Sequence, residues 1–223
     1  MSFINIAIDG PAGAGKSTIS KKVAAELGYA YIDTGAMFRA VALYVISNGG
    51  DTESGESVNK FLDDIDIDIK AGESGNIIYL NGEDVSGKIR TPEVSMGASN
   101  VGKIPEVRKK LLELQRKIAA NANVVMDGRD IGTYVLPDAQ VKIFLTASAE
   151  IRARRRLQEL MEKGENVTFD EVLKDMIKRD ENDSKREIAP LMQAADAILV
   201  DTTHLTLEKS IEKVFQTVKE IVG

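Results

Sequence analysis

The stretch from Gly10 to Ser17 reads Gly-Pro-Ala-Gly-Ala-Gly-Lys-Ser and matches the pattern G-x-x-x-x-G-K-[ST]. Glycines allow backbone N–H groups to curl around phosphate oxygens, and a following helix points its positive end at the same oxygens. Lys16 would bridge the β- and γ-phosphates of a nucleotide, and the Ser17 hydroxyl would ligate a Mg²⁺ bound to them. The stretch is therefore predicted to be a phosphate-binding loop, or P-loop, in preference to a coincidental Gly-rich turn.

Asp127 is the candidate for a second metal carboxylate. The run Val124-Val-Met-Asp127 is short and apolar and ends in an acid, as expected at the end of a buried strand beside a P-loop. Asp127 is predicted to hold Mg²⁺ through a water molecule. The alternative is that Asp127 only caps the turn at the strand end.

The arginines indicate which kind of P-loop protein this is. An enzyme that phosphorylates an already phosphorylated acceptor brings two polyanions together and needs cations between them. Arginine suits this task because its planar fork binds phosphate through two hydrogen bonds. One helical face cannot present four neighbouring arginines, so about half of the 152–156 cluster, and also Arg116, are expected to be plain surface residues. The candidates are Arg39, Arg129, Arg152, Arg154, Arg155, Arg156, Arg179 and Arg186.

The elements that must position these residues alternate along the chain. Helical periodicity runs from Lys16 to the stop signal at Gly28 and returns in five later stretches. Because strands alternate with helices, we predict an α/β fold with a parallel sheet flanked by helices. The predicted strands cover 3–8, 29–32, 123–126, 141–146 and 197–200, and the later helices cover 35–47, 105–122, 148–163, 169–179 and 206–222.

One stretch departs from this alternation. Ile65, Ile67 and Ile69 alternate with polar residues, a Gly-containing turn follows at 72–75, and a second strand pattern ends at Asn81-Gly82, a strong hairpin signal. Residues 65–86 are therefore predicted to form a small antiparallel sheet inserted into the α/β core.

Composition excludes several classes of protein. With 223 residues, 43% of them hydrophobic, the chain is long enough for one folded α/β domain. The absence of cysteine excludes disulfides and thiolate metal sites, and no signal peptide or apolar run of about 20 residues is found, so we expect a cytoplasmic protein. The net charge of −6 argues against nucleic acid and membrane partners, and we expect a monomer. The single histidine, His204, is expected to have a capping or surface role.

The chain resembles the bacterial cytidylate kinases from residue 4 to about residue 201. The resemblance implies a core of residues 1–33, 104–153 and 169–223, a nucleoside-monophosphate-binding part of residues 34–103 that contains the inserted sheet, and a short lid of residues 154–168. The matching segments are Ile8-Asp-Gly-Pro-Ala-Gly-Ala-Gly-Lys-Ser17, Asp33-Thr-Gly-Ala-Met-Phe-Arg39, Gly82-Glu-Asp-Val-Ser86, Ile89-Arg-Thr91, Asp127-Gly-Arg-Asp-Ile-Gly-Thr133, Pro137-Asp-Ala139, Lys142-Ile-Phe-Leu145 and Arg179-Asp-Glu-Asn-Asp183 with Arg186.

The resemblance also assigns site residues. Lys16, Arg129, Arg179, Arg186 and Asp127 would be catalytic. ATP would be bound by Gly10, Pro11, Ala12, Gly13, Ala14, Gly15, Lys16, Ser17, Thr18, Arg152 and Arg156. CMP would be bound by Thr34, Arg39, Ser99, Arg108, Arg129, Asp130, Arg179, Asp183 and Arg186.

The resemblance to cytidylate kinases implies that a serine, an arginine and an aspartate select the base of the acceptor nucleotide. In this chain they are Ser99, Arg108 and Asp130. Cytosine offers an amine donor and ring-nitrogen and carbonyl acceptors, which an aspartate and an arginine can pair respectively. Thr34 departs from the family pattern, where serine is more often expected. Its extra methyl group leaves open the balance between ribose and deoxyribose acceptors.

The expected reaction is phosphoryl transfer from ATP to CMP or dCMP with Mg²⁺, giving ADP and CDP or dCDP. The attacking phosphate oxygen is already anionic, so no general base is required. One alternative is an adenylate- or uridylate-type kinase, which would share the P-loop but not the inserted sheet. Others are a nucleotide-dependent switch protein and a kinase of an unphosphorylated metabolite, and the many arginines argue against the last.

Overall fold

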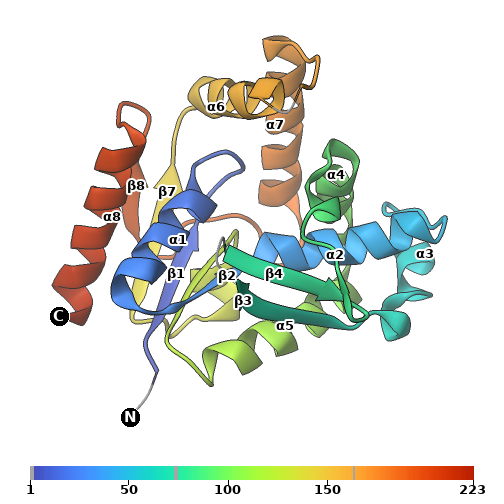
Figure 1. The fold of residues 1–223 in the computed structure, drawn as a ribbon, viewed down its shortest axis with the longest axis horizontal. Helices are drawn as coiled ribbons and strands as arrows, with labels where there is room; N and C mark the ends of the chain where they lie inside the picture. The colour runs from blue at the N-terminus through green and yellow to red at the C-terminus, as the bar shows by residue number, and fades with distance from the viewer. Residues whose placement is uncertain (1–2, 73–74, 163) are drawn as a thin grey trace.

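The computed structural model describes residues 3–72, 75–162 and 164–223. Its main sheet has five parallel strands in the order β2-β6-β1-β7-β8, which confirms the predicted fold class (Figure 1). Of the three inner strands, β6 and β1 are almost wholly buried, as their apolar runs predict. The strands are β1 (Asn5–Asp9), β2 (Ala30–Asp33), β6 (Val124–Gly128), β7 (Val141–Thr146) and β8 (Ile198–Asp201).

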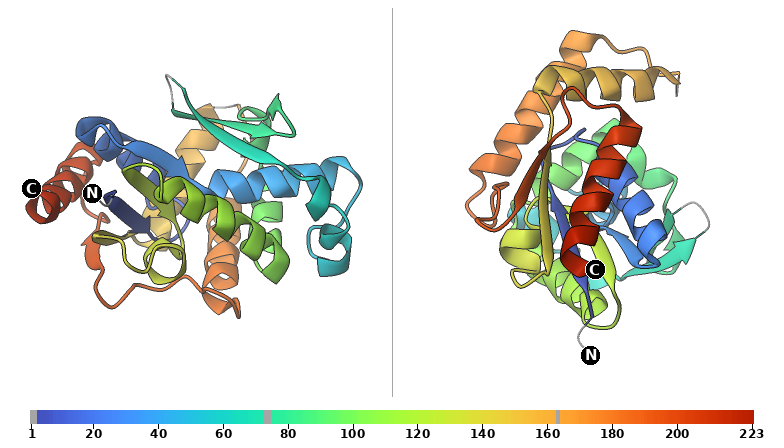
Figure 2. Two further views of the ribbon diagram at one scale, coloured as in Figure 1. Left: turned by 90° about the horizontal axis from the view of Figure 1, so that it is seen from below. Right: turned by 90° about the vertical axis from the view of Figure 1, so that its left-hand side faces the viewer.

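Helices cover both faces of this sheet (Figures 1 and 2). Successive side chains of a strand point to opposite faces, so β1 contributes to the core on each side. Ile6 and Ile8 pack in one core with the apolar stripes of α1 (Lys16–Leu27) and α8 (Leu207–Val222). Ala7 packs in the other core, with residues of α2 (Thr34–Ser47) and α5 (Pro105–Ala119). Because both faces of the sheet are buried, the residues at the ends of its strands are held on a rigid support.

The carboxyl ends of three neighbouring strands each carry an aspartate. In the parallel register Asp33 lies beside Asp127, and Asp9 lies beside Gly128. Parallel strands present their carboxyl ends at one edge of the sheet, where ligands bind in open α/β folds. The sequence order therefore brings these acids and the P-loop to the same edge.

A second, antiparallel sheet of three strands lies beside α2, within the predicted 65–86 insertion (Figure 1). Its strands are β3 (Ile67–Gly72), β4 (Gly75–Leu80) and β5 (Glu83–Asp84), and the predicted turn residues 73–74 lie outside the described residues. The short helix α3 (Gly55–Asn59) precedes it. Helix α4 (Pro92–Val101), which was not predicted from the sequence, follows it and packs on α2 through Gly97.

Helices α6 (Ala149–Glu162) and α7 (Phe169–Lys185) pack on each other above the P-loop edge (Figure 1). They share a small core that includes Leu160, Val172 and Met176. The prediction that the second of these helices ends at residue 179 was wrong, because it continues to Lys185. The predicted end of the first, at residue 163, lies outside the described residues.

The structure also differs from the prediction at the end of α5 and in the segment after β6. Helix α5 ends at Ala119 rather than at residue 122, and a short π-helix, Ile131–Val135, follows β6 where no element was expected. Among the described residues, no helix is both long and apolar enough to cross a membrane.

Candidate active site

A cleft of about 520 Å³ opens at the carboxyl ends of the main sheet. The P-loop forms one wall, and the start of α2 and the inner face of α4 form another. The end of β6 forms the floor, while α6 and α7 supply charged side chains from above. Residues far apart in the sequence, from Ala12 to Arg186, therefore meet in one cavity.

The P-loop has the backbone conformation that its glycines permit. Gly10 has a φ of +150°, and a Cβ placed there would lie 1.9 Å from the Leu145 carbonyl oxygen of β7. Gly15 has a φ of +89° and is the N-cap of α1, so the positive end of that helix faces the cleft. The predicted succession of strand, loop and helix is confirmed.

Lys16 lies inside the P-loop, and its Nζ donates to the Pro11 carbonyl oxygen at 2.7 Å. The side chain is almost completely buried. Burial, with a further contribution from Arg129, lowers the pKa of Lys16 to about 7. Burial makes the charged form of Lys16 unfavourable in the free protein. A phosphate beside the ammonium group would stabilise that form.

Ser17 and Asp127 meet on the floor of the cleft. The Ser17 hydroxyl donates to Asp127 Oδ2 at 2.8 Å, and the Tyr31 hydroxyl donates to Oδ1 at 3.1 Å. Burial, together with the neighbouring Asp33, raises the pKa of Asp127 to about 6. A cation placed here would stabilise the ionised form of Asp127. The adjacent oxygens of Ser17 and Asp127 suit Mg²⁺, an ion that keeps several of its waters and binds substrate phosphates. The described residues contain no cluster of three or more acidic or histidine side chains arranged to hold a metal by themselves.

Several guanidinium groups converge above this floor. Arg129 donates through Nε to Asp183 at 2.8 Å. Arg179 is half-buried, and its Nε, which is itself shielded from solvent, has no hydrogen-bond partner among the residues that the structure describes. Burial and the nearby Arg129 lower the pKa of Arg179 to about 10, so it stays protonated at neutral pH. A phosphate group bound here would offset the repulsion between these neighbouring guanidinium groups.

Asp33 organises the cations at the start of α2. Its carboxylate accepts from the Ala36 N–H at 2.9 Å, which caps the helix, and pairs with Arg39 at 2.8 Å and Arg90 at 3.8 Å. Although burial opposes ionisation, the two arginines lower the pKa of Asp33 below its usual value. The Thr34 hydroxyl donates to the Asp127 carbonyl oxygen at 2.7 Å, which ties α2 to β6.

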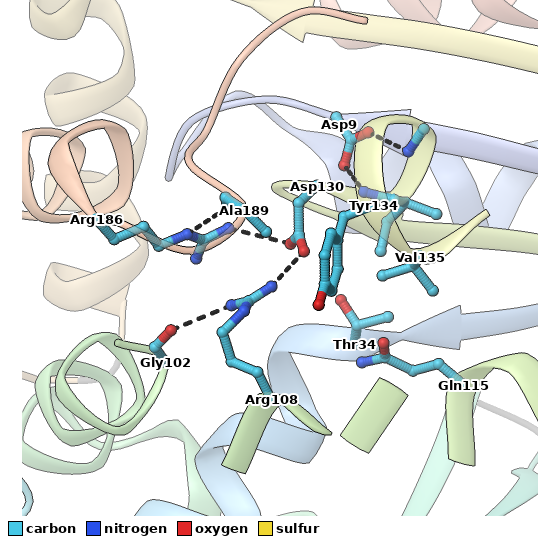
Figure 3. A network of polar contacts seen from close by, with 12 residues as sticks. Asp9, Thr34, Gly102, Arg108, Gln115, Asp130, Tyr134, Val135, Arg186 and Ala189 are labelled. Carbon is cyan, nitrogen blue, oxygen red and sulfur yellow. Dashed lines mark hydrogen bonds and ion pairs between the residues drawn. The ribbon is translucent and has the colours of Figure 1, made fainter. Parts of the chain in front are cut away.

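Asp130 is the centre of a buried network beyond the phosphate-binding side of the cleft (Figure 3). Arg108 from α5 and Arg186 both bind its carboxylate, the second at 3.1 Å. Arg108 also donates to the Gly102 carbonyl oxygen and lies near the rings of Phe38 and Tyr134. Asp130 is thus held by two cations at a position where it lines the cleft.

Comparison with known proteins agrees with this geometry. The protein-family model described as cytidylate kinase matches residues 6–220. The chain belongs to the cytidylate kinase family. The resemblance stated from the sequence is confirmed.

Individual relatives of the cytidylate kinase family are similar along their whole lengths. A cytidylate kinase from Caldicellulosiruptor saccharolyticus is 53% identical, covering 100% of this chain and 99% of that protein. The cytidylate kinase of Clostridioides difficile is 51% identical over 96% of this chain and 97% of its own length. A solved structure of an uncharacterized protein from Eubacterium ventriosum has a TM-score of 0.52 at 13% identity, with coverage of 97% and 98%, and shows the fold alone.

Most residues expected from the cytidylate kinase resemblance line the cleft. Arg108 and Arg152 do not. Arg152 is buried, donates to the carbonyl oxygens of Ala12 and Ala147 at 2.9 Å each, and pairs with Asp180 at 2.7 Å. It braces the P-loop from behind. Three P-loop residues, Gly10, Pro11 and Ala14, also do not line the cleft.

The predicted site residues that line the cleft are Ala12, Gly13, Gly15, Lys16, Ser17, Thr18, Thr34, Arg39, Ser99, Asp127, Arg129, Asp130, Arg156, Arg179, Asp183 and Arg186.

Several charged residues of this site were not predicted from the sequence, among them Glu159 and Glu162, which line the cleft from α6. Asp33 and Arg90 also line the cleft, and Asp9 is buried behind it. Asp9 and Asp33 each end an apolar run, which is the signal that identified Asp127. The same rule applied to every strand would have found both.

Proposed function

We propose that this protein transfers the γ-phosphoryl group of ATP to CMP, with dCMP as a second acceptor, and releases ADP and CDP or dCDP. The observation that carries the proposal is that one cleft contains both halves of such a site. Its P-loop faces a group of arginines and the buried Arg108–Asp130–Arg186 network. A site for ATP alone does not need this second, cation-rich half.

The P-loop side would hold the donor. Backbone N–H groups of residues 10–18, apart from Pro11, which has none, would surround the phosphates, with Lys16 between the β- and γ-phosphates. Ser17 would ligate Mg²⁺ directly, and Asp127 would hold it through a water molecule. When bound, the ion would neutralise charge on the phosphates. Arg156 lines the cleft from α6 and would approach the ATP from the lid, whereas Arg152 would support the loop.

The opposite side would hold the acceptor. Arg39, Arg129, Arg179 and Arg186 are proposed to bind its phosphate and the transferring group. Thr34 and Asp183 would lie near its sugar. Ser99, Arg108 and Asp130 would recognise cytosine, and the buried Ser99 hydroxyl, which has no partner among the described residues, supports this assignment. A base that lacks the matching groups would leave these atoms unpaired.

The chemistry requires positioning more than proton transfer. An anionic oxygen of the acceptor phosphate attacks the γ-phosphorus, and the bond from that phosphorus to the bridging oxygen of ADP breaks. No proton must be removed from the nucleophile, so Asp130 is assigned to binding. The arginines stabilise charge on the group in transit.

The moving parts are proposed to follow the sequence boundaries. Residues 34–103 would close over CMP and residues 154–168 over ATP, with the remainder as a fixed core. We further propose that the protein works in the cytoplasm as a monomer on free nucleotides.

A rate screen over CMP, dCMP, UMP, AMP and GMP tests the acceptor. CMP should give the highest kcat/KM, and AMP as the best substrate would exclude the proposed specificity. ADP release measured with and without CMP tests the switch alternative, which predicts turnover that does not depend on an acceptor. Chelation of divalent cations should abolish transfer, and added Mg²⁺ should restore it.

A further inference from the structure

The π-helix Ile131–Val135 directly follows Asp130 and begins with that residue's own carbonyl group. The Val135 N–H donates to the Asp130 carbonyl oxygen at 3.1 Å, and the Leu136 N–H donates to that of Ile131 at 2.7 Å. Such i to i+5 turns are rare and often occur at functional sites. The backbone position of Asp130 therefore depends on where this turn sits.

Asp9 binds the first turn of the π-helix. Its Oδ1 accepts from the Ile131 N–H at 2.8 Å, and its Oδ2 accepts from the Gly132 N–H at 2.7 Å (Figure 3). The side chain is buried, and the proposed mechanism gives it no role. Because Asp9 is followed directly by Gly10, one residue connects the start of the donor loop to the segment that holds Asp130.

Arg116 binds the opposite end of the same turn. From α5 its Nε donates to the Val135 carbonyl oxygen, and its Nη2 donates to that of Tyr134, each at 2.9 Å. The sequence suggested a plain surface residue, and the residue is indeed exposed, yet its head group is bound. A carboxylate at the N–H end and a guanidinium at the carbonyl end are the arrangement that the helix dipole favours.

We propose that Asp9 and Arg116 are positioning residues that set the place of the Asp130 carboxylate against the acceptor base. The inference rests on the proposed function, in which Asp130 recognises cytosine. Arg108 and Arg186 orient the side chain of Asp130, while the two ends of the π-helix fix its backbone. Loss of either end would let the carboxylate shift relative to the P-loop, and selectivity between bases would fall before stability is lost.

The test uses Arg116→Met with Lys117→Met as the matched control. Both replace an exposed cation on adjacent positions of α5, but only Arg116 binds the turn. Each variant is given an equimolar mixture of CMP and UMP with ATP, and the ratio of CDP to UDP formed is measured. This ratio does not depend on how much of the protein is folded.

Arg116→Met should lower the ratio about tenfold, as expected for a misplaced binding group, and leave the KM for ATP unchanged. Lys117→Met should match the wild type. Asp9→Asn, which exchanges one acceptor oxygen for a donor, should lower the ratio in the same direction. If Asp9→Asn fails to fold, Arg116→Met decides alone.

Two results would overturn the inference. If Asp130→Asn lowers the ratio and Arg116→Met does not, the positioning role fails while the proposed function stands. If the wild-type protein does not phosphorylate CMP, the proposed function fails, and the inference fails with it.

Discussion

At the scale of single residues, Lys16 shows how the site is prepared for a polyanion. Its ammonium group is buried beside Arg129, and the pKa is lowered to about 7. Phosphate oxygens placed next to it would favour the charged form and raise that pKa. At pH 8 the free protein should hold Lys16 mainly neutral, and ATP binding should therefore be coupled to uptake of up to about one proton.

Calorimetry can measure that uptake. The enthalpy of ATP binding at pH 8, measured in buffers of different ionisation enthalpy, should change with a slope that corresponds to proton uptake by the protein. Lys16→Met should remove this uptake and also depress turnover far more than CMP affinity. A wild-type slope of zero would contradict the low pKa. At pH 6, where Lys16 is already charged, the uptake by this group should disappear.

Asp130 should determine the choice between cytosine and uracil. Its carboxylate is an acceptor for the exocyclic amine of cytosine, and uracil has a carbonyl group at that position. Asp130→Ala should reduce the preference for CMP over UMP by about 1.5 to 3 kcal/mol, which is tenfold or more. Unchanged selectivity in kcat/KM would refute the assignment, and circular dichroism would check that the variant is folded.

At the scale of elements, the sequence predicted those parts whose apolar pattern is strong. The five strands, α1 and the inserted sheet have clear periods and turn signals. Helix α4 was missed because its buried residues are only Val94, Gly97 and Val101, too sparse for a recognisable stripe. Its N-cap Thr91 and the following Pro92 were the available signal.

The end of α7 and the π-helix could not be read from local pattern. Residues 180–185 are polar, and Asp183 is held there by the ion pair with Arg129, a contact distant in sequence. The π-helix likewise depends on Asp9 and Arg116 from other elements. The same holds for the site. The sequence identified most of the residues that line the cleft, but it gave no sign that Arg152 would lie behind the P-loop.

Gly10 sets the contact between the P-loop and β7. Any side chain there would collide with the Leu145 carbonyl oxygen, which cannot move because it belongs to the sheet. Gly10→Ala should lower the free energy of unfolding by about 4 kcal/mol or more. Gly28→Ala is the matched control: that glycine also has a positive φ, of 68°, but nothing lies near its Cβ position, so about 1 to 2 kcal/mol is expected. Urea unfolding measures both, and equal losses would contradict the steric argument.

At the scale of the whole molecule, an acidic chain encloses a cation-rich cleft. The net charge of the chain is −6, whereas the lining of the cavity has six arginines and Lys16 against four aspartates and two glutamates. Aspartates hold several of these cations in place, as Asp33 holds Arg39 and Asp183 holds Arg129. The cations are therefore positioned before any nucleotide arrives, which lowers the cost of binding.

The two sides of the cleft should respond separately to the two nucleotides. Ser95 and Ser99 line it from α4, whereas Arg156 and Glu159 line it from α6, so each substrate would contact one side first. Hydrogen exchange followed by mass spectrometry should show that CMP slows amide exchange in α4 and at the start of α2. A non-hydrolysable ATP analogue should slow it in the P-loop and in α6.

Both ligands together should protect both sides more than either ligand alone, because closure around one substrate brings the parts that hold the other closer. Helix α8 is the internal control, since it packs on the sheet and lines none of the cleft, and its exchange should not change. Protection of α6 by CMP alone, without protection of α4, would mean that the acceptor binds on the other side. That result would reverse the assignment of the two halves, even if the overall reaction were unchanged.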